Sequence, residues 1–242
     1  MKTYSGDTSG FTLVEMAIVM VIVGLMLGGL MMSLSQTTEN TRRSDVQTQL
    51  AEINEALYGY AQANGRLPCP ATTTSNGAEL PLGGGVCSRQ HGFVPSATLG
   101  LKGAVNADGL LLDPWNNPLR YSVTTANSSA FTTANSMQTA MASPTGLASL
   151  TPDLRICRQA ACTNLISSTI PVVVLSMGKN WAAFASADEV ENAGEATVGG
   201  YRIANDSDFV SATYNEANFD DLISWLSPNI LYTKMIAAGK LP

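Results

Sequence analysis

A long apolar run close to the N-terminus, from Phe11 to Leu34, restricts the possible structures of this chain more than any other part of it. Glu15 is the only charged residue in the run. A helix of this length rises roughly 36 Å, which is enough to cross a bilayer. Inserting a carboxylate near one end of such a helix costs about 1 to 3 kcal/mol, so we infer that Glu15 has a function.

The apolar run is predicted to be retained as a membrane anchor. A secretory signal has a shorter apolar core, followed by a cleavage site of the Ala-x-Ala type. No such site follows this run, and a polar leader, MKTYSGDTSG, precedes it. We therefore expect residues 1–10 to form a leader and residues 11–34 to form a transmembrane helix.

A second helical pattern continues beyond the run. Its apolar residues recur every three or four positions, which predicts an amphipathic helix with one buried stripe. Gly65 and then Pro68 mark its end. The members of the stripe are Val46, Leu50, Ile53, Leu57 and either Tyr60 or Ala61. One helix is therefore predicted over residues 11–64, and its amphipathic half, 35–64, requires a globular layer to cover the stripe.

Residues 65–242 are expected to supply that layer as a head of helices and strands. Alternating apolar residues at 119–123 follow the turn-forming sequence DPWNNP and predict a strand. The run PVVVLSM, which starts at Pro171, is the strand expected to be most buried. Residues 122–145 are rich in Ser, Thr, Ala and Asn and are interpreted as a polar insertion or a weak hairpin. Near the C-terminus, Ser227 is expected to cap a final helix.

The four cysteines fall in two close couples without a repeated CxxC pattern, which favours disulfides over a metal site. Pairing within each couple is one of three possible connectivities. Disulfides imply an oxidising compartment outside the cytoplasm. The cysteines are Cys69 with Cys87 and Cys157 with Cys162.

The charge balance argues against nucleic acid as a partner. Lys and Arg number 13 against 19 for Asp and Glu, which gives a net charge of -6. Apart from the adjacent pair Arg42 and Arg43, the sequence has no basic stripe that could follow a phosphate backbone.

The sequence GFTLVE at residues 10–15 resembles the prepilin signal, GFTLxE, of type IV pilins and type II secretion pseudopilins. The resemblance implies that a prepilin peptidase cleaves between Gly10 and Phe11 and methylates the new amine of Phe11. It also implies that Glu15 faces the positive N-terminus of a neighbouring subunit during assembly. Opposite charges attract strongly at low dielectric, and each removes the cost of leaving the other unpaired. An ordinary single-pass anchor with an incidental glutamate is the alternative interpretation.

Segments of the head resemble the same family. DPWNNPLRY is similar to the DPWGxPxxY turn of major pseudopilins, and SMGKN at 176–180 and DDLISW at 220–225 are similar to two further segments. LPCP and the terminal AGKLP look most like larger, minor pilin-like proteins. The resemblance implies an α+β, type IV pilin-like fold, in which the long N-terminal helix packs on an antiparallel β-sheet. It also implies that an inner-membrane platform and its ATPase assemble the subunits.

The resemblance raises one possible metal site. In some major pseudopilins the loop between the last two segments binds calcium, a hard cation that takes oxygen ligands. This sequence departs from that pattern, because Asn180 stands in place of the aspartate and Trp181 in place of a glycine. A solvated acidic loop without a cofactor is therefore the competing interpretation. The candidate ligands are Asp206, Asp208, Asp220 and Asp221.

We expect this chain to be a structural subunit, with a minor or tip position favoured by the size of the head. Before assembly it would be a single-pass protein of the inner membrane with its head in the periplasm. After assembly it would lie in a pilus or pseudopilus filament or at the cell surface, among other pilin subunits. A tip adhesin with a ligand-binding head is the first alternative.

A membrane-tethered periplasmic enzyme is the second alternative. The only histidine, His91, would need Ser88 or Ser96 and Asp108 to form a triad, and no nucleophile elbow surrounds these residues. The glycine run at 83–85 lacks the Lys-Ser/Thr and the helix start of a phosphate-binding loop, so a surface loop closed by a disulfide is favoured. We therefore predict that the chain is not an enzyme.

Overall fold

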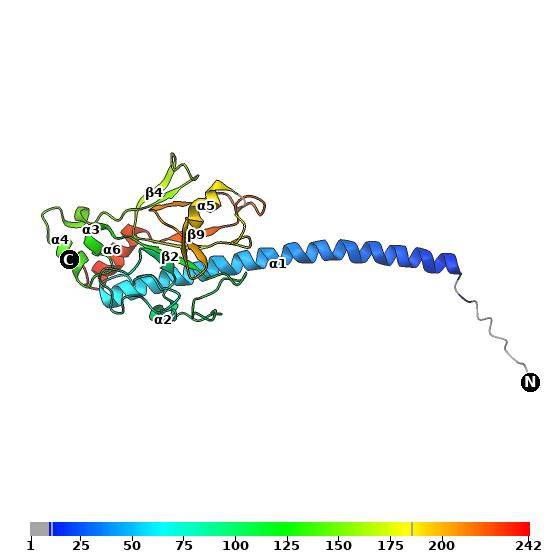
Figure 1. Cartoon of the computed structure of the whole chain (residues 1–242), viewed down its shortest axis with the longest axis horizontal. Coiled ribbons are helices and arrows are strands. Elements are labelled where there is room, and N and C mark those ends of the chain that lie inside the picture. Colours follow the sequence, from blue (N-terminus) through cyan, green and yellow to red (C-terminus); the bar gives the residue numbers. More distant parts are fainter. Residues whose placement is uncertain (1–9, 11, 185) are drawn as a thin grey trace, which may run out of the picture. The chain divides into compact units, whose positions relative to one another are not determined.

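The structure of the chain is a computed structural model. The residues that it describes are 10, 12–184 and 186–242, and the side chains of 27–35 are not among them. The chain divides into two units, Met1–Ser44 and Asp45–Pro242. The longest element, α1, runs from Leu13 to Asn64 and contributes to both units (Figure 1).

In the first unit, α1 presents apolar side chains to solvent. Leu13 is 88% exposed and Met20 is 70% exposed. Within the described part of the chain, no helix combines the length and the apolar character that crossing a membrane requires. The predicted transmembrane segment, 11–34, includes Phe11 and part of the 27–35 stretch, which lie outside the described residues and side chains. That segment stays a prediction.

In the second unit, α1 carries the predicted buried stripe. The stripe closes with Ala61, which is fully buried, whereas Tyr60 is half-buried. Gly65 ends the helix with a φ of 69°, a left-handed conformation that glycine adopts without a steric penalty. The other buried members of the stripe are Val46, Leu50, Ile53 and Leu57.

A four-stranded antiparallel sheet packs against this stripe (Figure 1). Tyr121 and Val174 share one hydrophobic core with the helix, while Val173 and Leu175 on the opposite face belong to a second core. The two strands predicted from the sequence are confirmed, and every residue of the second is buried. The strand order is β1 (His91–Phe93), β2 (Arg120–Val123), β5 (Val172–Ser176) and β9 (Leu222–Trp225).

A second, three-stranded sheet packs against the face of the first sheet that α1 leaves open, through Leu154, Ile156 and Phe209. β3 pairs with β4 in antiparallel and with β8 in parallel orientation. The head is therefore α+β as predicted, but this second sheet is mixed and not antiparallel throughout. The strands are β4 (Leu165–Ile170), β3 (Leu154–Cys157) and β8 (Asp208–Val210), and a separate hairpin joins β6 (Ala196–Val198) to β7 (Tyr201–Ile203).

Short helices fill the connections and correct two predictions. Residues 122–145 do not form a weak hairpin, because short helices follow the end of β2. Ser227 precedes the last helix, but its side chain makes no capping hydrogen bond, and Pro228 at the first position removes one of the free N–H groups instead. The helices are α2 (Ser96–Leu99), α3 (Ala126–Ser129), α4 (Ser136–Met141), η1 (Gly146–Ser149), α5 (Ala187–Ala193) and α6 (Pro228–Ala237).

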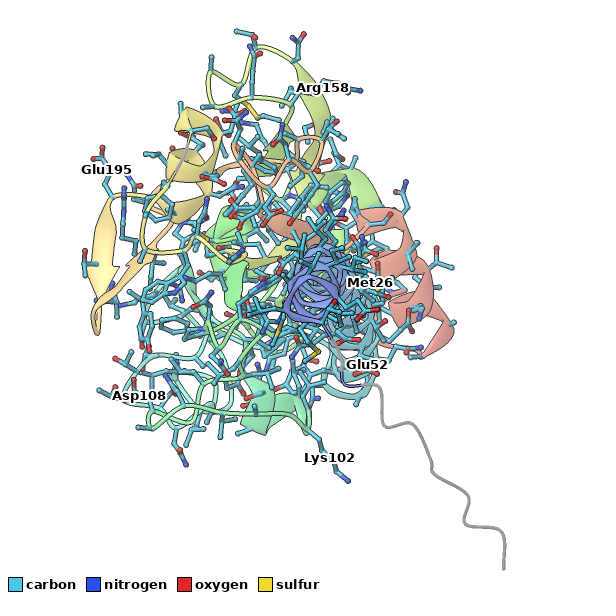
Figure 2. All side chains as sticks on the ribbon, turned by 90° about the vertical axis from the view of Figure 1, so that its right-hand side faces the viewer. Met26, Glu52, Lys102, Asp108, Arg158 and Glu195 are labelled. Carbon is cyan, nitrogen blue, oxygen red and sulfur yellow. A yellow bond between two sulfur atoms is a disulfide. The ribbon has the colours of Figure 1, made fainter. Side chains whose placement is uncertain are left out.

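Most charged side chains of the head lie at its periphery. Figure 2 shows Lys102, Asp108, Arg158 and Glu195 there, on loops and strand ends that face solvent. Charged residues are rarely buried unless they are paired. The buried charged residues of the head are therefore exceptions, and the partners of several of them are described below.

Candidate functional site

The N-terminal motif forms the first turn of α1. Thr12 immediately precedes the helix and Glu15 is its third residue. The N–H and Oγ1 of Thr12 donate to Glu15 Oε2 at 2.8 and 2.9 Å, and the N–H of Glu15 donates to Thr12 Oγ1 at 3.2 Å. This arrangement is a capping box, in which each side chain satisfies a backbone N–H near the helix start. The carboxylate also lies at the positive end of the helix dipole.

The capping box gives the Glu15 carboxylate hydrogen-bond donors from its own chain, without a neighbouring subunit. A carboxylate that accepts hydrogen bonds costs less to hold in apolar surroundings than one without a partner. Gly10, which precedes the predicted cleavage point, is exposed. Phe11, on the other side of that point, lies outside the described residues.

An apolar groove of about 350 Å³ runs along α1 beside the capping box. A surface of this kind offers packing and no polar chemistry. Its natural partners are lipid chains or another apolar helix. The residues that line the groove are Leu13, Val14, Ala17, Ile18, Val21 and Ile22.

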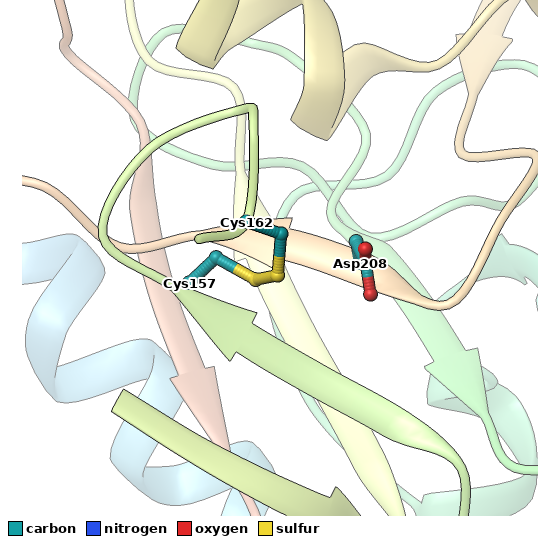
Figure 3. Close-up of side chains that lie close together, drawn as sticks. All are labelled: Cys157, Cys162 and Asp208. Atoms are coloured by element: carbon teal, nitrogen blue, oxygen red, sulfur yellow. A yellow bond between two sulfur atoms is a disulfide. The ribbon is translucent and has the colours of Figure 1, made fainter. Parts of the chain in front are cut away.

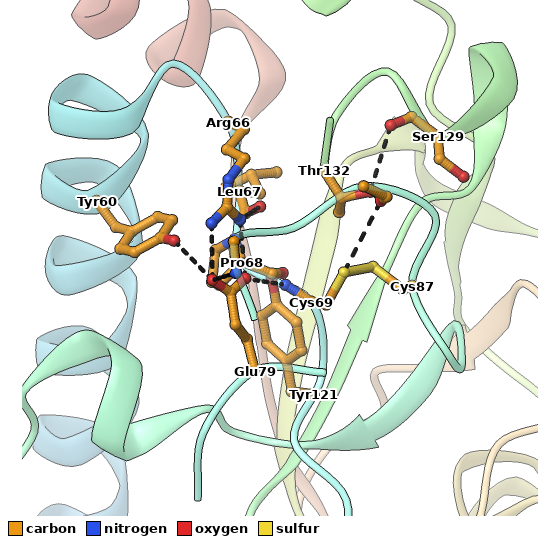
Figure 4. The surroundings of a disulfide bond; sticks show 12 residues. Tyr60, Arg66, Leu67, Pro68, Cys69, Glu79, Cys87, Tyr121, Ser129 and Thr132 are labelled. Carbon is orange, nitrogen blue, oxygen red and sulfur yellow. Dashed lines mark hydrogen bonds and ion pairs between the residues drawn. A yellow bond between two sulfur atoms is a disulfide. The ribbon is translucent and has the colours of Figure 1, made fainter. Parts of the chain in front are cut away.

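In the head, both cysteine couples form disulfides, Cys69–Cys87 and Cys157–Cys162. The first closes a loop around a buried ion pair (Figure 4). Arg66 donates to both oxygens of Glu79, at 2.8 and 2.7 Å. The remaining donors to that carboxylate are Tyr60 Oη and the N–H groups of Cys69 and Gly83, at 3.1, 3.1 and 3.2 Å.

The electrostatics of Glu79 reflect this complete set of donors. Burial acts to raise the pKa of the carboxyl group, but the hydrogen bonds from Arg66 and Cys69 and the charge of Arg66 outweigh it, so the pKa is lowered. Glu79 is therefore a charged group whose partners all come from the chain itself. It holds the end of α1 and the disulfide loop together.

The glycine run at 83–85 is a closed surface loop. Its three N–H groups donate in turn to Glu79 Oε1, the carbonyl of Pro81 and the carbonyl of Thr132. A phosphate-binding loop would instead point its N–H groups at the anion. The geometry thus favours the disulfide-closed loop over the phosphate interpretation.

The four candidate calcium ligands separate into two places. Asp208 is held by Arg155, which donates to both its oxygens at 2.6 and 2.5 Å. Among the described residues, the one group of three potential ligand residues with atoms within 4.8 Å of one another is Cys157, Cys162 and Asp208 (Figure 3). Its two sulfur atoms are joined in a disulfide, so they offer no thiolate to a metal.

Asp220 and Asp221 are buried elsewhere, beside α5. Lys179 and Asn180 donate backbone N–H groups to Asp220 Oδ2 at 2.8 and 3.2 Å, and Asn192 Nδ2 donates to Asp221 Oδ2 at 2.8 Å. The N–H of Asp220 in turn donates to the buried Glu189 at 3.0 Å. These contacts draw α5 and the segment before β9 into one acidic cluster.

This cluster lacks the donors that surround Glu79. The Oδ1 atoms of Asp220, Asp221 and Asn180 are buried and have no hydrogen-bond partner among the described residues. Burial raises the pKa of Asp220 to about 6 and that of Asp221 well above its usual value, with the charge of Glu189 adding to both shifts. Calcium takes several oxygen ligands around one point, and among the described residues no three carboxylates of this cluster have ligand atoms within 4.8 Å of one another. The calcium site itself stays a prediction.

The structure does not assemble the triad considered from the sequence. His91 Nδ1 lies 2.9 Å from Ser122 Oγ, a residue of the neighbouring strand, and among the described residues no hydrogen bond joins it to Ser88 or Ser96. Burial lowers the pKa of His91 to about 4. Asp108 lies at the periphery of the head (Figure 2). His91 is thus a neutral residue packed in the sheet.

Two of these features were missed from the sequence for different reasons. The capping box has a readable signature, a threonine followed three residues later by a glutamate before an apolar run. Glu79 carries no such local signal, because its partner Arg66 is 13 positions away across a loop of unpredicted path.

In comparisons with known proteins, only the N-terminal part of the chain has a match. The family model of the prokaryotic N-terminal methylation motif matches residues 7–31. No curated protein and no solved structure matches the chain.

Proposed function

We propose that this chain, whose residues 7–31 carry a prepilin signal like that of type IV pilins and pseudopilins, is a structural subunit of a type IV pilus or a type II secretion pseudopilus. The match to the methylation motif is the observation that carries the proposal. The capping box of Thr12 and Glu15 and the exposed apolar surface of α1 support it. The subunit works by assembly through its N-terminal helix.

Processing is the first step of the proposed mechanism. A prepilin peptidase removes residues 1–10 and methylates the amine of Phe11. The methylated amine of Phe11 keeps its positive charge, four positions before Glu15 in the sequence. Residues 11–34 hold the subunit in the inner membrane as a single span, with the head on the periplasmic side, where disulfides persist.

Assembly then exchanges one apolar environment for another. The platform and its cytoplasmic ATPase move the helix out of the bilayer, and the groove along α1 packs against helices of other subunits. Glu15 is the polar group that defines the register of this packing. In the isolated subunit, Glu15 accepts hydrogen bonds from Thr12. In the filament it faces the N-terminal amine of a neighbouring subunit, where the low dielectric strengthens the attraction between the two charges.

The position in the filament is proposed to be minor. The four-stranded sheet packed on α1 is accompanied by the additional three-stranded sheet and by the β6–β7 hairpin. These additions enlarge the head beyond what covering the helix stripe requires. A large head is easier to accommodate in a subunit used in few copies or at the tip.

Intact mass after expression with a prepilin peptidase tests the processing step. We expect a mature chain that begins at Phe11 and carries one added methyl group. Gly10→Trp should block cleavage, whereas Gly6→Trp, in the same leader, should not. A wild-type chain that still begins at Met1 in the presence of an active peptidase would refute the proposal.

Filament incorporation tests the assembly step separately. Glu15→Ala is expected to be cleaved normally but to be lost from sheared filaments in a host that encodes the assembly machine. Glu39→Ala is the matched control, because Glu39 lies on the same helix and its partner Arg42 is 3.9 Å away on that helix. If both variants appear in filaments as often as the wild type, Glu15 does not act in assembly.

A further inference from the structure

The β6–β7 hairpin is attached to the head differently from the other strands. It forms a sheet of its own, and among the described residues no backbone–backbone hydrogen bond joins residues 196–203 to the rest of the head. A two-stranded hairpin is at best marginally stable by itself. The side chains of the hairpin must therefore hold it in place.

Tyr201 joins the hairpin to several segments of the head. Its ring lies edge-on to Phe93, with 5.5 Å between the ring centres, and 6.0 Å from the ring of Trp181. Its hydroxyl accepts a hydrogen bond from Asn106 Nδ2 at 3.1 Å. The guanidinium carbon of Arg120 lies 5.2 Å from the centre of the Tyr201 ring and 4.8 Å from that of Phe93. One side chain of the hairpin thus contacts both β1 and β2 of the main sheet.

Arg120 is an unusual partner, because it is a buried cation. It takes part in no ion pair among the described residues, its Nη1 donates to the Pro118 carbonyl at 3.2 Å, and its Nε has no hydrogen-bond partner. Burial lowers its pKa to about 10, so it stays charged at neutral pH. The attraction between a cation and an aromatic ring strengthens when water is excluded. The ring of Tyr201 therefore stabilises this charge as long as the hairpin covers it.

The hydrophobic core beneath the hairpin is small. Ile203 is the only buried residue of 196–203, and it packs with Ala71, Phe93 and Leu110 in a cluster separate from the two main cores. Segments with few buried apolar contacts open locally at a lower free energy than the main core. Moving the hairpin away would leave both main cores intact.

The base of the hairpin allows it to move as a unit. Arg202 Nε donates to the Gly194 carbonyl at 2.7 Å, and the N–H of Glu195 donates to Asn205 Oδ1 at 3.0 Å, so the two strands are tied together at their base. Gly194 has a φ of 66° and a ψ of 179°, a conformation open essentially to glycine alone. A hollow of about 280 Å³ beside the base shows that it is not packed there as a core would be. The hollow is lined by Val190, Glu191, Gly194, Glu195, Asn205 and Asp206.

We propose that the β6–β7 hairpin is a lid over Arg120, held closed by the ring of Tyr201, which opens by backbone rotation at Gly194 while the rest of the head stays folded. Opening uncovers the Arg120 guanidinium and the Phe93 ring beside the edge strand β1. The bonds within the hairpin and across its base remain formed in the open state. The lid does not depend on the proposed role in a filament.

Hydrogen exchange of the full chain in detergent micelles, followed by mass spectrometry, tests the lid. In Tyr201→Ala we expect the amides of 196–203 to exchange at least about tenfold faster than in the wild type, while those of β2 and β5 keep their rates. Thr197→Ala is the matched control, because Thr197 is an exposed residue of the same hairpin, and it should leave the rates nearly unchanged. Hairpin rates that Tyr201→Ala does not change would overturn the proposal. So would a variant in which β2 and β5 accelerate by the same factor, because the hairpin would then open only when the whole head unfolds.

A conservative variant shows which part of Tyr201 holds the lid. Tyr201→Phe keeps the ring against Arg120 and Phe93 and removes only the hydroxyl that accepts from Asn106. We expect hairpin exchange in Tyr201→Phe to stay within about threefold of the wild type, and the melting temperature of both Tyr201 variants should confirm that the head remains folded. Exchange as fast in Tyr201→Phe as in Tyr201→Ala would mean that the hydrogen bond, and not the ring, keeps the hairpin closed.

Discussion

Glu79 and Asp221 are both buried acids of the head, and their surroundings differ. Glu79 accepts five hydrogen bonds, two of them from Arg66. Asp221 accepts one, from Asn192, and its Oδ1 has no hydrogen-bond partner among the described residues. The pKa of Glu79 is lowered despite burial, whereas burial raises the pKa of Asp221 well above its usual value.

The difference shows how a buried carboxylate becomes tolerable. Desolvation opposes the charged form at both sites, and only a full set of donors with a cation offsets it. Glu79 obtains that set from its own chain, so its site is structural. Asp220 and Asp221 have fewer donors, so burial favours their protonated forms. The contribution of this cluster to stability should therefore change with pH and with the cations in solution. The contribution of Glu79 should change mainly when one of its partner residues is substituted.

The largest effect is expected from breaking the Glu79 site. Glu79→Ala leaves Arg66 buried without its partner, which should lower the free energy of unfolding by about 3 to 5 kcal/mol. Replacing both residues, as Arg66→Met with Glu79→Leu, should restore much of that loss, because no charge then remains buried. Denaturant unfolding of the head measures both.

Glu52→Ala, at an exposed position of α1, is the control for the Glu79 variants and should change little. If the double variant is no more stable than Glu79→Ala, the loss arises from packing and not from an unpaired charge. The comparison between the two sites would then lose its electrostatic basis.

Calcium is expected to act on the other site. A cation that binds only the folded head at a concentration a hundredfold above its dissociation constant stabilises it by about 2.7 kcal/mol. We predict that calcium raises the melting temperature of the wild type and of Glu79→Ala, but not that of a variant carrying Asp220→Asn and Asp221→Asn. Calorimetry with and without a chelator provides the measurement. A rise that survives the double substitution would place calcium elsewhere.

Features formed by residues close together in the sequence could be predicted, whereas contacts between residues far apart in the sequence could not. The long helix and its stripe were predictable, because their pattern repeats every few residues. The strand that starts after Pro171 was predictable because its first four residues, Val172–Leu175, form a continuous apolar run. The capping box also spans only four residues, Thr12 to Glu15. It was missed because Glu15 was interpreted only as a residue that contacts a neighbouring subunit.

Pairings across the chain could not be predicted in the same way. The partners Asn192 and Asp221 are 29 positions apart, and Arg155 and Asp208 are 53 positions apart. β4 was missed because it is exposed for most of its length, so its sequence lacks the alternation that marks a strand. The four acidic residues therefore looked like one loop, although the fold places Asp206 next to Asp208, at the start of β8, and buries Asp220 and Asp221 elsewhere.

The next prediction concerns pH. The folded pKa of Asp221 lies above its unfolded value of 3.8, so its contribution to stability is complete below pH 3.8 and is lost as pH rises toward the folded pKa. The pKa of Glu79 is lowered from 4.5, so its contribution is present above pH 4.5 and is lost as pH falls through the folded pKa. The two acids should thus give pH dependences of opposite sign.

Asp221→Asn isolates one of these slopes. With a chelator present, the variant is expected to gain about 1 to 2 kcal/mol over the wild type between about pH 5 and pH 8, because an amide needs no counter-ion and still accepts from Asn192. Unfolding free energies measured across that range test it. A gap that stays constant with pH would mean that Asp221 is not the titrating group.

The smallest effect should come from an acid that is neither buried nor short of partners. Glu55 pairs with Lys234 at 2.8 Å, but its side chain is 70% exposed. Water and salt already screen such a pair, so Glu55→Ala should cost only about 0.2 to 1 kcal/mol, and less at high salt. Lys234 also lies over the ring of Tyr58, a contact that the substitution leaves in place. A loss as large as that of Glu79→Ala would show that burial is not what separates these sites, because an exposed and a buried ion pair would then count equally.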